Sequence, residues 1–179
     1  MIYKFRVILD AQEDVFRDIA IDENDTLEDL HNTIVNAFGF DGQEMASFYT
    51  SDEQWAQGDE IPLFDTGDNP GEMDTMADYR LGDILDRENT KIIYVYDFLN
   101  MWTFFVELAA IEEPESGDAY PLVLFSHGQM PAMAPEKNFA DADENEFDFS
   151  DDDYDDEDLD MFDEGGENFE DYGFEENWN

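Results

Sequence analysis

The sequence predicts an α+β fold in which one main helix packs on a mixed sheet of about five to six strands. Three observations support this class. Apolar and polar residues alternate near the N-terminus, apolar residues recur at helical spacing from Thr26 to Phe38, and aromatic and β-branched residues fill residues 91–111. With 42% hydrophobic residues among 179, the chain has enough apolar side chains for one core.

The first elements should form a β-grasp-like opening, a hairpin followed by the main helix. Residues 3–9 alternate apolar and polar side chains, as a half-buried strand does. Val15, Arg17, Ile19 and Ile21 suggest a second strand that pairs with the first as a hairpin. Thr26 is the expected N-cap, and Asp29, three residues on, completes a capping box. Gly39 directly follows Phe38 and is the expected left-handed end of the helix.

The remaining elements follow in order along the chain. Residues 45–50 predict a short strand, residues 51–78 an acidic loop with Gly and Pro, and residues 79–85 a short second helix. Residues 91–111 predict two strands joined near Leu99 to Met101, because their aromatic and β-branched side chains favour pleated packing. Residues 120–125 predict a last strand with Pro121 at its start, where a missing amide donor is tolerated.

The charge excludes two classes of partner. The chain has 7 Lys and Arg against 50 Asp and Glu, a formal net charge of −43. Binding nucleic acid through its phosphates, or an anionic membrane surface, needs clustered Lys and Arg that this chain lacks. No run approaches the ~18 apolar residues of a membrane span, no secretory signal is recognisable, and there is no cysteine. We therefore expect a cytoplasmic protein whose oligomeric state is left open.

The composition changes near Lys137, the last basic residue. Residues 141–179 contain 20 Asp and Glu with no Lys or Arg, and aromatic residues lie singly among the acids. Such charge density opposes collapse, whereas interspersed rings allow folding on a partner. We therefore expect a domain at 1–137 and a disordered acidic tail at 138–179. The candidate contact residues of this tail are Phe147, Phe149, Tyr154, Phe162 and Trp178.

An ordered series of motifs resembles a known family. The stretches "YKFRVIL", "EMASF", "YVYDFLNMWTFFVEL" and "GQMPAMAPE" lie in order between about residues 3 and 136. Together they resemble the plasmid pRiA open-reading-frame-three-like domain, which occurs in plasmid- and transposon-associated genes. The resemblance implies a compact α+β domain and assigns it no catalytic activity, and the acidic tail is not part of the shared pattern.

Individual positions both match and depart from this family's pattern. The helix motif is matched by Leu30, His31 and Ile34, and the strand motif by Tyr96, Asp97, Phe98 and Trp102. Phe16, Arg17 and Asp18 stand where the family has tryptophan and paired arginines, and Leu99 replaces a turn glycine. Two expected histidines are replaced by Glu44 and Phe104. If the family's histidines form a site, this chain lacks most of it.

One candidate cleft consists of His31, Asp97 and Trp102. His31 could act as a general base, or it could pack against the sheet and make one hydrogen bond to a strand carbonyl. Asp97 could face a cleft, or its carboxylate could satisfy amides of the following turn. The sequence favours the packing role for His31, which lies among the apolar positions of its helix.

No cofactor or metal site is predicted. With no cysteine and only His31 and His127, the chain is short of ligands for zinc. Residues 141–152 have acids at the first loop positions of a calcium-binding motif but lack its glycine. There is no nucleophile elbow, phosphate-binding loop or dinucleotide fingerprint.

Three functions remain open. The first is a non-enzymatic interaction protein whose acidic tail engages a basic protein surface. The second is a ligand-binding domain whose tail mimics DNA or inhibits the domain by occupying Lys4, Arg6 and Arg17. The third is an enzyme with a cleft near His31 and Asp97. A tail that only keeps the protein soluble would explain the composition equally well.

Overall fold

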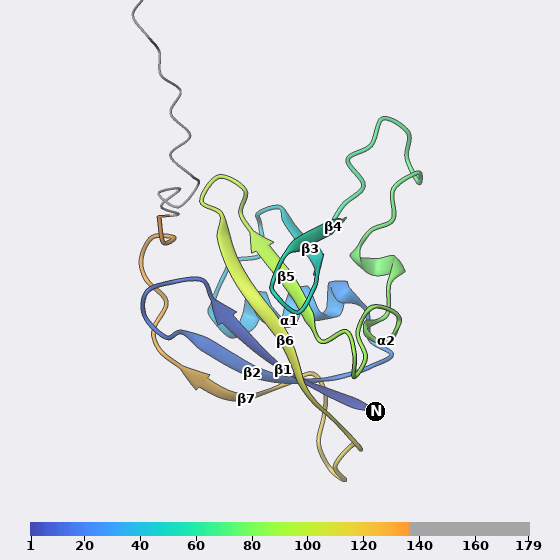
Figure 1. Ribbon diagram of the computed structural model, residues 1–179, viewed down its shortest axis with the longest axis vertical. Coiled ribbons are helices and arrows are strands. Elements are labelled where there is room, and N and C mark those ends of the chain that lie inside the picture. The colour runs from blue at the N-terminus through green and yellow to red at the C-terminus, as the bar shows by residue number, and fades with distance from the viewer. Residues whose placement is uncertain (137–179) are drawn as a thin grey trace, which may run out of the picture. The chain divides into compact units, whose positions relative to one another are not determined.

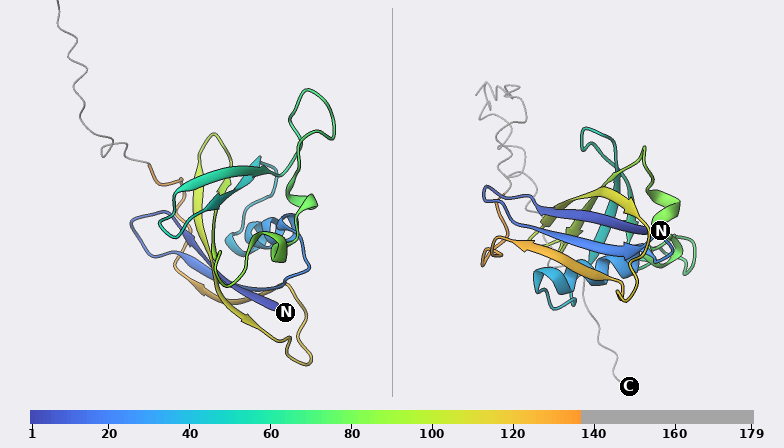
Figure 2. Two further views of the ribbon diagram at one scale, coloured as in Figure 1. Left: turned by 45° about the vertical axis from the view of Figure 1, so that its right-hand side comes forward. Right: turned by 90° about the horizontal axis from the view of Figure 1, so that it is seen from below.

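The computed structural model describes residues 1–136, and these form one antiparallel sheet with the main helix on one face (Figures 1 and 2). The sheet order is β4-β3-β5-β6-β1-β2-β7. The elements are β1 (Ile2–Leu9), β2 (Phe16–Asp22), α1 (Leu27–Phe38), β3 (Ala46–Ser51), β4 (Gln57–Pro62), the 3₁₀ turn η1 (Met76–Asp78), α2 (Leu81–Ile84), β5 (Lys91–Tyr96), β6 (Trp102–Glu112) and β7 (Leu122–His127).

Two features of the sheet differ from the sequence prediction. All neighbouring strands pair antiparallel, so the sheet is not mixed. It has seven strands rather than five or six, because β4 lies inside the segment predicted to be a loop. The sequence of β4, QGDEIP, is exposed over its first four residues, and an exposed polar strand lacks the apolar alternation from which strands are recognised.

The predicted opening, a hairpin followed by a helix, is present. β1 and β2 pair from Ile2 opposite Asp22 to Ile8 opposite Phe16. Alternate residues of β1 are buried in the core, among them Phe5 and Val7. β1 also pairs with β6 along its other edge, so the strand is hydrogen-bonded on both sides. Both strands of the hairpin therefore lie inside the sheet and not at its edge.

The ends of α1 are those predicted. The Thr26 hydroxyl accepts from the amide of Asp29, and the Asp29 carboxylate accepts in return from the amide of Thr26, which completes the capping box. Gly39 has φ 75°, and its amide donates to the Val35 carbonyl. The buried face of the helix consists of Leu27, Leu30, His31, Thr33, Ile34, Val35 and Phe38.

β5 and β6 carry the aromatic part of the core. Tyr94 and Phe104 face each other in the register of the two strands, and both are fully buried. The ring of Phe38 from α1 lies 4.6 Å from that of Phe104, and the ring of Phe48 from β3 lies 4.9 Å from that of Tyr94. Burying each such side chain stabilises the fold by roughly 2 kcal/mol. This packing fixes α1 against the middle of the sheet.

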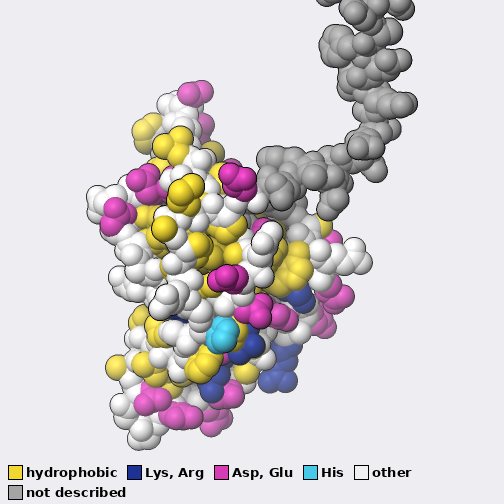
Figure 3. Space-filling view, turned by 90° about the vertical axis from the view of Figure 1, so that its left-hand side faces the viewer, with side chains coloured by type: hydrophobic (Ala, Val, Ile, Leu, Met, Phe, Trp, Pro, Cys, Tyr) yellow, Lys and Arg dark blue, Asp and Glu magenta, His cyan; other side chains and the backbone are white. Residues whose placement is uncertain are grey.

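β7 lies at one edge of the sheet, beside β2, and all six of its residues are exposed. Phe125 and His127 both contact the ring of Phe16, which stacks on the imidazole at 5.0 Å. Figure 3 shows the side of the molecule that carries β7 in Figure 1, with hydrophobic side chains spread over the face and Lys and Arg gathered in its lower half beside a histidine. β7 is thus attached through strand pairing and ring contacts rather than through burial.

Candidate functional site

His31 lies between α1 and the sheet, where it pairs with Tyr94. Its Nδ1 is 2.7 Å from the Tyr94 hydroxyl, and the side chain is 3% exposed. Burial lowers the pKa of His31 to about 4 and raises the pKa of Tyr94. Both groups are therefore neutral near pH 7. The partner on the strand is a hydroxyl, where the sequence led us to expect a backbone carbonyl.

Asp97 shapes the turn between β5 and β6. Its backbone has φ 60°, and its carboxylate accepts hydrogen bonds from the amides of Leu99 and Asn100 at 3.1 and 3.4 Å and from the Asn100 side chain. The Met101 amide donates to the Asp97 carbonyl at 2.6 Å and closes the turn. Aspartate tolerates the left-handed conformation better than most residues. The carboxylate is thus used by its own turn, which was one of the two roles considered for it.

Trp102 packs in an aromatic group next to this turn. Its ring lies edge-on to Phe40 at 5.5 Å, and Phe40 stacks on Tyr96 at 4.4 Å. The Tyr96 hydroxyl donates to Asp41 at 3.0 Å. No hydrogen bond joins any two of the three predicted cleft residues within residues 1–136. The three residues belong to the same domain but do not form a common polar site.

The basic residues of the first hairpin have partners of their own. Lys4 pairs with Glu112, and Arg6 makes a bidentate pair with Asp18 at 2.8 and 2.9 Å. Arg17 is 8% exposed and donates to three backbone carbonyls, one of them that of His127 on β7. A tail that occupied these three residues would have to displace these contacts, and nothing in the described residues favours that reading.

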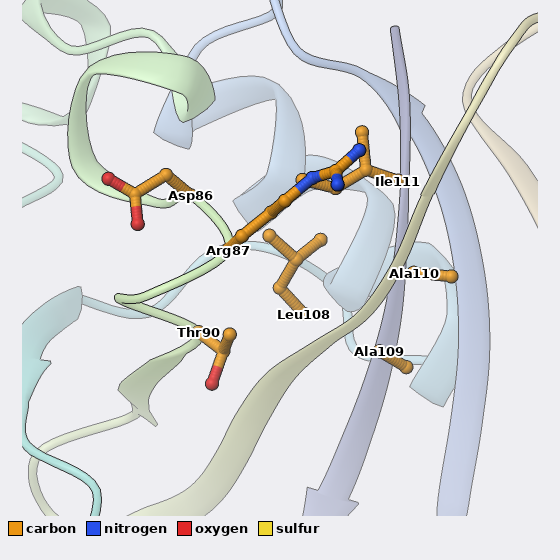
Figure 4. Close-up of a pocket in the computed structure, with 7 residues that line it drawn as sticks. All are labelled: Asp86, Arg87, Thr90, Leu108, Ala109, Ala110 and Ile111. Atoms are coloured by element: carbon orange, nitrogen blue, oxygen red, sulfur yellow. The ribbon is translucent and has the colours of Figure 1, made fainter.

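A surface hollow that was not predicted from the sequence lies at the other end of β6 (Figure 4). It has a volume of about 350 Å³. Its lining residues come from the segment between α2 and β5 and from the end of β6, and they are Asp86, Arg87, Thr90, Leu108, Ala109, Ala110 and Ile111. The only sequence signal was Arg87 itself, one of seven basic residues, within the acidic segment "LDRENT".

Two other kinds of feature are absent from the part of the chain that the structure describes. It holds no cluster of three or more metal-ligating side chains, and none of its helices is long and apolar enough to cross a bilayer. The candidate contact residues of the tail, from Phe147 to Trp178, lie outside the described residues. The hollow beside Arg87 is therefore the candidate site on the described part of the chain.

These features define a class of protein: an α+β domain built on one antiparallel sheet and one main helix, with an arginine-lined hollow on its surface. The chain belongs to the family described as "Plasmid pRiA4b ORF-3-like protein", whose model matches residues 1–178. The match extends past residues 3–136, which carried the resemblance in sequence, and includes the acidic segment.

Comparison with solved structures supports the fold. The chain is similar to the crystal structure of a protein of unknown function from Methanosarcina mazei Go1, with a TM-score of 0.60 and 24% sequence identity. The similarity covers 70% of this chain and 68% of that one. No curated protein matches the chain significantly. The shared fold leaves the activity to be argued from the residues themselves.

Proposed function

We propose that the chain is a non-enzymatic interaction protein that engages a basic protein partner through the acidic, aromatic residues after Lys137. The observation that carries this proposal is the composition of residues 141–179, with 20 acidic residues and no Lys or Arg. Carboxylates attract a cationic surface over a distance and raise the rate of encounter. The absence of cysteine agrees with a cytoplasmic setting.

The charge of the domain adds to this attraction. Residues 1–136 carry 30 Asp and Glu against 6 Lys and Arg. Three of these bases are engaged by acids of the domain itself, in the pairs Lys4–Glu112, Arg6–Asp18 and Lys91–Glu107. Pairing leaves the surplus acids without a counterion in the described part of the chain. A basic partner would therefore be attracted by the domain as well as by the tail.

The rings of the tail should determine affinity once the partner has arrived. Phe147, Phe149, Tyr154, Phe162 and Trp178 are spaced among acids, so each ring can reach a surface without a neighbouring ring. Aromatic side chains supply large apolar contact areas and interact with Lys and Arg through their faces. Charge alone would bind any polycation, whereas rings add shape-dependent contacts.

Calorimetric titration with a synthetic lysine- and arginine-rich peptide tests this proposal in the full chain. We expect binding that weakens with salt, because exposed charges are screened over ~8 Å at physiological ionic strength. Changing the five rings to serine keeps the charge and should weaken binding about tenfold or more. A matched variant with serine at the exposed domain residues Phe64, Met73 and Met133 should bind as the wild type does.

Equal affinity of the ring variant and the wild type would refute the contact role of the rings and leave only unspecific attraction between opposite charges. The absence of any binding to the basic peptide at low salt would refute the proposal as a whole.

A further inference from the structure

The hollow beside Arg87 contains a strand edge without a partner. β6 runs from Trp102 to Glu112, but β5 pairs with it only as far as Glu107, and the last contact on that side is the Leu108 amide donating to the Thr90 carbonyl at 2.7 Å. Beyond Leu108, β6 pairs only with β1 among the described strands. About 13 Å of strand edge, four residues, is thus open towards the hollow.

A β-bulge shapes this open edge. The β1 register moves from Phe5 opposite Leu108 to Lys4 opposite Ala110, so Ala109 is an extra residue in β6. Leu108 and Ile111 are both partly or fully buried and contribute apolar side chains to the floor of the hollow. Small side chains at Ala109 and Ala110 leave the backbone accessible. The edge is thus open to a second strand over these residues.

Arg87 supplies a positive charge at this edge. Its side chain is exposed and makes no ion pair with any residue from 1 to 136. In Figure 4 it extends across Leu108 towards Ile111, and the Asp86 carboxylate points away from it. Asp86 accepts from the amides of Glu88 and Asn89 at 2.8 Å each, and these hydrogen bonds, that of Asn89 foremost, lower its pKa. Asp86 is thus held by its own loop.

The acids nearest to the hollow along β6 are paired with lysines. Glu112 pairs with Lys4, and Glu107 lies 3.7 Å from Lys91. Half of the six bases in the described residues therefore gather around the end of β6, in a chain with a net charge of −43. An anionic group that approaches the hollow along β6 therefore meets acids that are already paired with lysines, beside Arg87, which makes no ion pair with any described residue.

We propose that this hollow binds an extended peptide segment that carries a carboxylate. The peptide backbone would pair with the open edge of β6 from Ala109 to Glu112, and the carboxylate would bind the Arg87 guanidinium. The mode is strand addition, in which main-chain hydrogen bonds supply affinity and side-chain contacts supply specificity. The guanidinium fork matches a carboxylate with two parallel hydrogen bonds. The site consists of residues of the domain and goes beyond the function proposed above.

Fluorescence anisotropy of a labelled hexapeptide, with alternating threonine and valine and one glutamate, tests the proposal on the full chain. We expect saturable binding that weakens about tenfold when the glutamate is replaced by glutamine. Arg87→Ala should cause a loss of similar size. Arg80→Ala removes another exposed arginine, which directly precedes α2 and lies outside the hollow, and should leave the affinity unchanged. Methylation of alternate peptide amides should weaken binding, because it removes donors needed for strand pairing.

Each opposite result would overturn the proposal. Equal binding of the glutamate and glutamine peptides would refute the contact between the peptide carboxylate and Arg87. Equal binding of the peptide by Arg87→Ala and by the wild type would refute it as well. Undiminished binding of the methylated peptide would refute strand addition. The absence of any binding of the glutamate hexapeptide would refute the site itself. None of these results bears on binding of the basic peptide by the tail, which is measured with different variants.

Discussion

The buried pair of His31 and Tyr94 predicts a loss of stability as the pH falls from about 7.5 to 5. Burial lowers the pKa of His31 from 6.5 to about 4. Between these values the unfolded chain binds a proton that the folded chain does not, so acidification favours unfolding. With these two pKa values, the free energy of unfolding should decrease by about 2 kcal/mol between pH 7.5 and 5 through this one group.

Urea unfolding at several values of pH measures this decrease. The double variant His31→Phe with Tyr94→Phe removes the imidazole and its hydroxyl partner together, so no buried polar atom is left alone. It should lose about 2 kcal/mol less than the wild type between pH 7.5 and 5.

The reasoning compares slopes with pH and does not depend on the absolute stability of the variants. Most carboxylates whose pKa is shifted here, such as those of Asp41 and Asp86, have a lowered pKa and titrate below this range. If the double variant lost as much stability as the wild type from pH 7.5 to 5, the imidazole would not be the buried neutral group described above.

Three further predictions concern local structure, each checked by urea or thermal unfolding. Thr26→Ala should cost about 1 kcal/mol, whereas Thr26→Ser should cost less, because serine keeps the capping oxygen. Gly128→Ala should destabilise more than Gly39→Ala: both glycines have positive φ, but only at Gly128 would a Cβ meet the backbone of Asp14, and equal losses would contradict this. Asp97→Ala should lower the free energy of unfolding by about 1–3 kcal/mol. Asp97→Asn should lower it clearly less, because asparagine keeps an acceptor and tolerates the left-handed backbone. The reverse order would argue against a turn-capping role.

Local patterns predicted most of the elements. The helix ends at Thr26 and Gly39 were recognisable because capping uses residues within one turn of each other. The two strands of residues 91–111 were recognisable from side-chain type and a polar interruption. β4 was not predicted because it is stabilised by pairing with β3. The sequence of this exposed edge strand lacks the alternation of apolar and polar residues that would indicate such pairing.

The candidate sites were less predictable. That His31 packs against the sheet follows from its helical position, but its partner, Tyr94, is 63 residues away and required the folded chain. Arg87 was recognisable in the sequence as one of few basic residues. Its proposed role as a carboxylate-binding residue depends on β6 extending beyond β5 and on the lysines that pair with Glu107 and Glu112. Such relations arise from register between strands, which alternation along one strand does not specify.

The sequence by itself determined the α+β class, the capped main helix, the acidic segment after Lys137 and the family, because periodicity, capping and charge depend on neighbours along the chain. Only the tertiary structure decided the antiparallel order of seven strands, the neutral pair of His31 and Tyr94 and the open edge beside Arg87. These features depend on contacts between residues that are distant in the sequence. Such contacts contribute to stability only after the strands have paired in the sheet.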